Sequence, residues 1–344
     1  MLKFDTWVET EIGFNRIDYI SNQSKNKSLL WKISLNNGMV IKLHPHLKLK
    51  TISKQTRYTQ QFVWKMVKEV QNGDLIAITN NRQLNTWSGN GDFEEGWLLG
   101  EILGDGCLQN NSNHAYLCFW GENQKSMADI AVKIIKEKYK VRSDFKGYSI
   151  RDYSIVQTSF LSQLTKEFCL QKKEITYEVE SSSSDFYRGV LSGLFDSDGS
   201  VQGTQEKGIS VRLAQSNLPL LLAAQRMLNR LGIVSSIYEN RRKDEKFKLL
   251  PDGKGGHKLY PIKAQHELCI ANDNIHLFSS LVGFMDKEKS EKLNHLINNY
   301  KRALNRERFS SKVKSIEIFE EYYYTFPGEE PDEKHCNGFI ISVN

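Results

Sequence analysis

The sequence predicts an α+β protein in which an all-β domain is interrupted by a duplicated unit of helices and strands. Three observations predict it. Strand-like runs dominate the first 85 residues or so and return after about residue 306. Between them, a nonamer ending in Asp-Gly occurs twice, and the same order of elements follows each copy. The length of 344 residues also favours about two domains over one core.

The head of the chain is expected to be a small β unit. Strand-like runs occupy residues 6–10, 29–35 and 39–43. Asn36-Asn37-Gly38 lies between the last two and predicts a hairpin turn, because Asn and Gly tolerate positive φ. The stretch 86–92 is poor in aliphatic residues and predicts the linker out of this unit.

The middle of the chain contains the same unit twice. In the first copy we expect a helix over 97–104, a strand over 116–120, a helix over about 126–139 and an alternating strand over 148–156. In the second copy the corresponding segments are a helix over 187–197, a strand over 209–213, a helix over 219–231 and strands near 235–238 and 267–270. The aspartates of the two Asp-Gly pairs are 198 − 105 = 93 residues apart.

The two nonamers, 98–106 and 191–199, align without a gap. Each places small residues four apart, Gly100 with Gly104 and Gly193 with Ser197. Residues at this spacing share one helix face, so the two helices could pack with their backbones close together. Each helix is expected to stop at its Asp-Gly, with the glycine in a left-handed cap.

Asp105 and Asp198 would then meet near unsatisfied carbonyls at the negative helix ends. Carboxylate and carbonyl oxygens suit a hard cation such as Mg²⁺, which could relieve the repulsion between the two carboxylates and assist phosphodiester hydrolysis. The alternative, a plain helix-ending turn, accounts for one Asp-Gly but not for a matched pair followed by matched elements.

The nonamers resemble the LAGLIDADG motif of intein-encoded homing endonucleases, over about residues 97–300. The resemblance implies two αββαββα units whose sheets form a saddle over double-stranded DNA. It also implies a monomeric Mg²⁺-dependent endonuclease in which Mn²⁺ or Ca²⁺ can substitute for binding. Asp105 and Asp198 would hold the metals, with Gly104 and Ser197 contributing to the sites, whereas Asp196 would be structural.

The same resemblance implies one catalytic lysine in each unit. Lys173 and Lys289 match, with Lys172 and Lys287 as close alternatives. A cation there would stabilise charge developing at the scissile phosphate. DNA contacts are expected along alternating strands and in basic loops, although exposed charges without a DNA role fit these positions equally. The candidates are Arg151, Arg212, Arg241, Arg242, Lys243, Lys254 and Lys258.

Head and tail resemble the two parts of an intein splicing domain of the HINT type. The boundaries implied are 1–88 and 306–344 for this domain and 89–305 for the endonuclease, whose units cover about 96–182 and 183–305. His46, His335 and Asn344 match splicing positions, and host exteins would be partners. Met1 lacks the thiol or hydroxyl that begins splicing, and Leu43 and Val343 depart from the family pattern.

The composition sets outer limits on the function. The net charge of +6 permits DNA binding without requiring it. Five cysteines without a CxxC pair favour a reducing cytoplasm, and a signal segment or a membrane span is not expected. Two alternatives stay open: a splicing element whose nuclease is vestigial, and an RNA-binding maturase with LAGLIDADG units.

Overall fold

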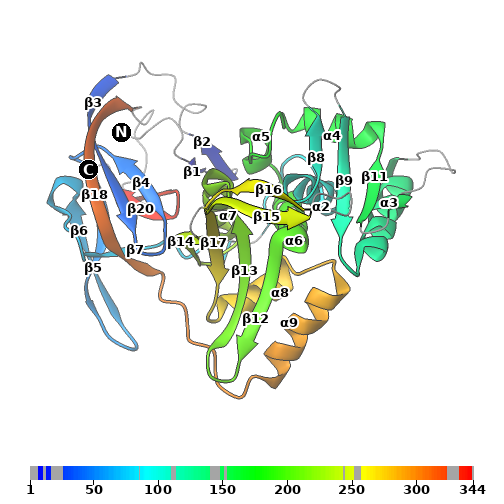
Figure 1. Cartoon of the computed structure of the whole chain (residues 1–344). Coiled ribbons are helices and arrows are strands. Elements are labelled where there is room, and N and C mark those ends of the chain that lie inside the picture. The colour runs from blue at the N-terminus through cyan, green and yellow to red at the C-terminus, as the bar shows by residue number, and fades with distance from the viewer. Residues whose placement is uncertain are drawn as a thin grey trace.

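The chain folds into a β-rich part and a larger mixed α/β part, which lie side by side (Figure 1). The structure is a computed structural model. It describes residues 7–10, 13–16, 26–84, 86–109, 114–139, 148–150, 153–242, 245–251, 257–323 and 333–342.

The β-rich part is built from both ends of the described chain. Its ten-stranded sheet has the order β2-β1-β19-β20-β5-β7-β18-β3-β4, with β6 paired to β5. Buried side chains from both segments, including Ile33, Leu49 and Ile341, form its core. The strands are β1 Trp7–Thr10, β2 Gly13–Arg16, β3 Asn26–Leu35, β4 Val40–Leu43, β5 Lys48–Gln55, β6 Gln60–Met66, β7 Leu75–Ala77, β18 Ser310–Tyr323, β19 Glu333–Cys336 and β20 Phe339–Ser342, with a 3₁₀ turn, η1, at Val67–Glu69.

The predicted hairpin turn between β3 and β4 is confirmed, with Gly38 at a φ of +85°. Glycine is required there for a second reason, since a Cβ on Gly38 would lie 2.8 Å from the Cβ of Ile237 in the α/β part. The amide of Ile237 donates to the carbonyl of Asn37 at 2.9 Å. The turn therefore joins the two parts of the molecule.

The α/β part contains two units with the element order αββαββα. The first consists of α2 Phe93–Leu103, β8 Cys107–Gln109, β9 His114–Trp120, α3 Gln124–Tyr139, β10 Tyr148–Ile150, β11 Tyr153–Gln157 and α4 Ser159–Glu167, and the short α5 Tyr177–Glu180 leads to the second. The second consists of α6 Ser184–Asp198, β12 Gly199–Thr204, β13 Gly208–Gln215, α7 Leu218–Arg230, β14 Ser235–Arg242, β17 Gln265–Ile270 and α8 Asn274–Leu281. The β15–β16 ribbon, Glu245–Pro251 and His257–Ile262, is inserted before β17, and α9 Lys287–Asn299 follows α8.

Local sequence explains where the two central helices begin. The Asp92 side chain accepts from the Glu95 amide and the Glu95 side chain accepts from the Asp92 amide, which is a capping box at the start of α2. The hydroxyl of Ser183 caps α6 by accepting from the Phe186 amide. Both helices are largely buried, and they lie between the two four-stranded sheets of the α/β part (Figure 1).

One strand prediction was wrong. The alternating run 148–156 is not a single strand but the antiparallel pair β10 and β11. The predicted DNA contact Arg151 falls between them, outside the described residues. Among the residues that the structure describes, none of the helices has the length and apolar character needed to cross a bilayer.

Candidate active site

Helices α2 and α6 pack with their backbones in direct contact. A Cβ added to Gly100 would lie well inside contact distance of the Val190 carbonyl oxygen, and one on Gly193 would meet the Trp97 carbonyl in the same way. A Cβ on Gly96 or on Gly189 would likewise lie inside contact distance of a carbonyl oxygen of the opposite helix. The small residues at intervals of four therefore form the predicted helix interface.

The close packing brings the ends of the two nonamers together. Asp105 follows the last turn of α2 and Asp198 is the last residue of α6. A carboxylate oxygen of Asp198 lies 3.4 Å from the position that a Cβ on Gly104 would take. The side-chain amide of Gln215 on β13, which the sequence did not single out, donates a hydrogen bond to the same oxygen.

Burial and mutual repulsion disfavour charge on these carboxyls. Burial, and next the charge of Asp105, raise the pKa of Asp198 to about 6, against the attraction of Lys173 and Lys289. Burial also raises the pKa of Asp105, and the same two lysines oppose the shift. A divalent cation between the carboxylates would compensate both effects.

The glycines after the aspartates act differently from what we predicted. Gly199 has a φ of −83°, and Gly106 is not among the glycines with positive φ, so neither forms a left-handed cap. A Cβ on Gly106 would lie 2.5 Å from the Cα of Ile102, and one on Gly199 would lie 2.9 Å from the carbonyl carbon of Phe195. These positions require glycine because the backbone passes so close to the preceding helical turn.

Each unit directs one lysine onto the end of its own nonamer helix. The ammonium of Lys173 donates to the Gly104 carbonyl. Lys289 donates to the carbonyls of Asp196 and, at 3.2 Å, Phe195. The structure thus places both predicted lysines beside the aspartates.

The alternative lysines lie in the solvent. Lys172 has 71% of its side chain exposed and pairs with Glu174 at 2.9 Å. Lys287 is 87% exposed and lies 3.7 Å from Glu291. Neither position suits a role at the aspartates, so the geometry favours Lys173 and Lys289.

Three further carboxyls, those of Glu101, Asp196 and Asp286, line the cleft beside Asp105 and Lys289. Asp196 accepts hydrogen bonds from the Trp97 indole at 2.8 Å and from the amides of Met285 and Asp286 at 3.0 and 3.1 Å, which fits a structural role. Glu101, which the sequence did not single out, is 2% exposed and has one carboxyl oxygen without a hydrogen-bond partner in the structure described. Burial, followed by the charge of Asp196, raises its pKa well above the usual range.

The oxygen donors of this site fit Mg²⁺, Mn²⁺ or Ca²⁺ better than a soft metal. Within the described ranges, no group of three or more His, Cys, Asp or Glu side chains could hold a metal by itself. Two carboxylates completed by water and phosphate oxygens are a usual Mg²⁺ arrangement. Of the other predicted ligands, the Gly104 carbonyl accepts from Lys173, and the Ser197 hydroxyl donates to the carbonyls of Gly193 and Leu194 at 3.1 Å.

The residues predicted to contact DNA differ in their bonding partners and in their exposure. Arg212 on β13 and Arg241 on β14 share the carboxylate of Glu267, at 3.3 and 3.4 Å. Arg242 donates to the Gln265 side chain at 3.3 Å, and Lys258 is exposed on β16. Lys243 and Lys254, like Arg151, lie outside the described residues.

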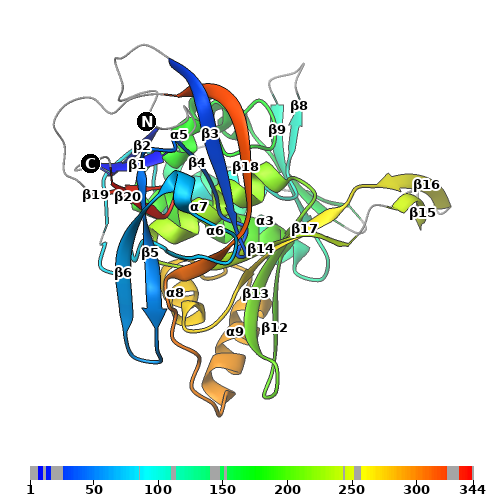
Figure 2. The same ribbon diagram turned by 90° about the vertical axis from the view of Figure 1, so that its left-hand side faces the viewer.

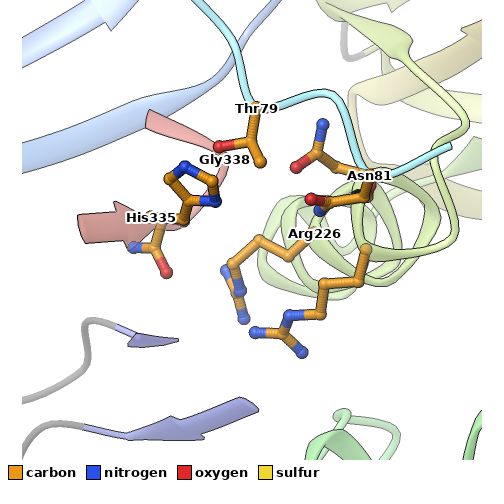
Figure 3. Close-up of a pocket in the computed structure, with 8 residues that line it drawn as sticks. Thr79, Asn81, Arg226, His335 and Gly338 are labelled. Atoms are coloured by element: carbon orange, nitrogen blue, oxygen red, sulfur yellow. Dashed lines mark hydrogen bonds between the residues drawn. The ribbon is translucent and has the colours of Figure 1, made fainter. Parts of the chain in front are cut away.

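The predicted splicing histidines lie in the β-rich part. His46 contacts His44, with ring centroids 5.2 Å apart. His335 on β19 lines a small pocket with Thr79 and with Arg226 of α7, so residues of both parts of the molecule meet there (Figure 3). Met1 and Asn344 lie outside the described residues.

Comparison with known proteins gives a family match within the second unit. Residues 185–283 match the family described as LAGLIDADG-like domain. This match covers most of the second unit.

Relatives match longer stretches of the chain. The ribonucleoside-diphosphate reductase NrdEB subunit alpha of Bacillus subtilis is 27% identical over 237 residues, 62% of this chain and 22% of that protein. A DNA polymerase of Thermococcus aggregans is 24% identical over 323 residues, 86% of this chain and 16% of that protein. The chain thus spans about a fifth or less of the length of these relatives.

Among solved structures, the chain has similarity to the homing endonuclease I-DmoI in complex with DNA and Mn. It is 19% identical and covers 55% of this chain and 96% of its own, with a TM-score of 0.36. Full-length DUF199/WhiA from Thermatoga maritima is 16% identical and covers 62% and 63% of the two chains, with a TM-score of 0.37.

Proposed function

We propose that the chain is a LAGLIDADG endonuclease that hydrolyses both strands of a specific duplex DNA site with a divalent metal. One observation carries the proposal. Asp105 and Asp198 meet at the ends of two helices in backbone contact, each beside a lysine of its own unit. A single chain supplies both half-sites, so the proposed enzyme acts as a monomer.

In the proposed reaction, a bound Mg²⁺ would supply Lewis acidity at the scissile phosphate and a more acidic water. Asp105 and Asp198 would hold the cation, and the side-chain amide of Gln215 orients the carboxylate of Asp198 by a hydrogen bond. Lys173 and Lys289 place positive charge beside the phosphates, where negative charge increases in the transition state. The rigid α2–α6 contact keeps these groups at constant separation.

The setting that we propose is an intein. The names of the two relatives denote unrelated activities, a nucleotide reductase and a polymerase, yet each contains a segment like this chain. An inserted element that can occupy different host proteins accounts for this pattern. The single sheet formed by the first and last described segments suits a splicing domain interrupted by the nuclease, with host exteins at its ends.

The test is cleavage of a duplex that carries the uninterrupted insertion site, in the presence of Mg²⁺. The wild-type chain should cut both strands, whereas Asp105→Ala and Asp198→Ala should not cut but should still bind the duplex in Ca²⁺. Cutting of both strands by either variant would refute the assignment.

A splicing element with a vestigial nuclease is the second candidate, because the shared sheet requires no cutting. Met1→Cys between foreign flanks should then yield a ligated product, while the wild-type chain cuts no insertion-site duplex. Cleavage by the wild-type chain would exclude this candidate.

A further inference from the structure

The hairpin of β5 and β6 is a basic ribbon that projects from the β-rich part (Figure 2). Residues 48–66 contain five Lys or Arg and not one Asp or Glu. β5 pairs with β20 at Lys48 and Leu49 and with β7 at Thr51. Among the described strands, only β6 accompanies it beyond that point, so the outer half is two strands wide.

Aromatic rings are exposed among these cations. Tyr58, Phe62 and Trp64 are 84%, 50% and 41% exposed. Lys50 is paired across the strands with Trp64, and its ammonium lies 5.5 Å from the Phe62 ring centroid and 5.6 Å from that of Trp64. Large exposed rings need an explanation, and interleaved rings and cations are typical of nucleic-acid surfaces.

The ribbon is also held in place. At its tip, the Thr56 hydroxyl accepts from the Tyr58 and Thr59 amides at 3.2 and 3.0 Å. At its side, the side-chain amide of Gln60 donates to the Arg308 carbonyl at 2.9 Å, and the Ser310 hydroxyl donates to the side-chain carbonyl of Gln55 at 3.2 Å. An ordered ribbon loses less conformational entropy on binding.

We propose that the β5–β6 ribbon is a second duplex-DNA contact, separate from the sheets of the α/β part. It binds through Lys50, Lys54 and Arg57 to phosphates, with Phe62 and Trp64 against the sugars. Two strands about 5 Å apart fit a major groove about 12 Å wide. The choice of duplex over single-stranded DNA rests on the proposed function, whose substrate is a duplex.

The test measures binding of the full chain to a fluorescent duplex that lacks the target site, in EDTA, over a range of NaCl concentrations. The variant is Lys50→Ala/Lys54→Ala/Arg57→Ala. The control, Lys133→Ala/Lys287→Ala/Lys292→Ala, removes the same charge from helices α3 and α9. Lys50 is half-buried and the other five side chains are exposed, and thermal melting verifies that both proteins fold.

The ribbon variant should bind the duplex at least tenfold more weakly at about 0.1 M salt. The slope of log K against log salt should decrease by about 2 to 3, since each phosphate contact contributes about 0.9. The control should bind like wild type. Equal duplex binding by variant and control would overturn the proposal. So would a variant that loses affinity for single-stranded DNA of the same length but keeps its affinity for the duplex.

The outcome for the ribbon is separable from the endonuclease proposal. If the ribbon variant binds non-target duplex like wild type and still cuts the target, only the proposal of a second DNA contact is refuted. If binding depends on the ribbon but the wild-type chain cuts no insertion-site duplex, only the endonuclease proposal is refuted.

Discussion

At the scale of single residues, the two motif aspartates lie where a negative charge is disfavoured unless a cation is present. Burial raises the pKa of both carboxyls, and Asp105 raises that of Asp198 further. Lys173 and Lys289 oppose the shifts, but they are directed at the carbonyl ends of the helices. In the proposed function, the carboxylates would bind the metal and the lysines would lie beside the phosphates.

The two lysines should affect cleavage without affecting metal binding. Replacing Lys173 or Lys289 by Met removes a positive charge beside the scissile phosphate, and we expect single-turnover cleavage to slow about 100-fold. The Mn²⁺ affinity measured by calorimetry should change little. Lys172→Met and Lys287→Met are matched controls because these side chains lie in solvent. Equal rates for all four variants would contradict the lysine assignment.

The stability of the protein should depend on pH through Glu180. This buried carboxylate pairs with Arg230 at 2.8 Å and with Arg226. Burial alone would raise the pKa of Glu180, but the two arginines outweigh it and lower the pKa below the ordinary 4.5. A lowered pKa in the folded state means that the stabilisation is complete above about pH 4.5 and is lost as the pH falls through the lower folded-state value.

Glu180→Gln should therefore destabilise the protein by about 3 kcal/mol at pH 7, because two arginines lose their buried partner. The difference from wild type should shrink at pH 4 and below, which urea unfolding at several pH values would measure. Glu137→Gln is the control, since that exposed side chain lies 3.8 Å from Lys133. A difference that stays constant from pH 7 to pH 3 would exclude the ion pair as its cause.

At the scale of elements, the helices that carry the motif were the most predictable. Their apolar periodicity, their small residues and the repeated Asp-Gly placed both helices within a few residues of their observed bounds. Segment 148–156 was misread because a tight hairpin of alternating residues has the same period as one strand. α9 was not predicted, because its face is largely polar and only Leu293 is buried.

The carboxylates of the site could be predicted, but their supporting contacts could not. Asp105 and Asp198 follow from a repeated pattern. Gln215 comes from a different strand and Glu101 stands where the second nonamer has Leu194, so neither carries a signal in one sequence. Lys173 could be distinguished from Lys172 only by the direction of its side chain, which depends on tertiary packing.

The α2–α6 interface should not tolerate a single added methyl group. Gly100→Ala or Gly193→Ala would push a Cβ into a carbonyl of the opposite helix, and we expect a loss of about 3 kcal/mol in urea unfolding. Gly203→Ala on β12 is the control, since its nearest neighbours would lie 3.2 to 3.3 Å away. Equal losses would mean that helix contact is not the cause.

At the scale of the whole molecule, the two parts are joined where the chain leaves and re-enters the β-rich part. Arg82, just after β7, forms hydrogen bonds to both oxygens of Asp273 at 2.8 and 2.7 Å. Asp273 also accepts from the Glu307 amide at 3.0 Å, and Phe309 lies under the Arg82 guanidinium at 5.0 Å. One arginine therefore connects the outgoing segment, the second unit and the returning segment.

Removing this connection should uncouple the two parts. In Arg82→Met, the Asp273 carboxylate loses a bidentate partner, and its pKa, which hydrogen bonding to Arg82 holds down against the effect of burial, should rise toward the ordinary value. Each part keeps its own core, so calorimetry should show two separated unfolding transitions where wild type shows one. Arg57→Met at the exposed ribbon tip should leave a single transition. If Arg82→Met also unfolds in one step at the wild-type temperature, the other contacts between the two parts, such as those of Asn37 with Ile237 and of Asn81 with Asn229, suffice to couple them.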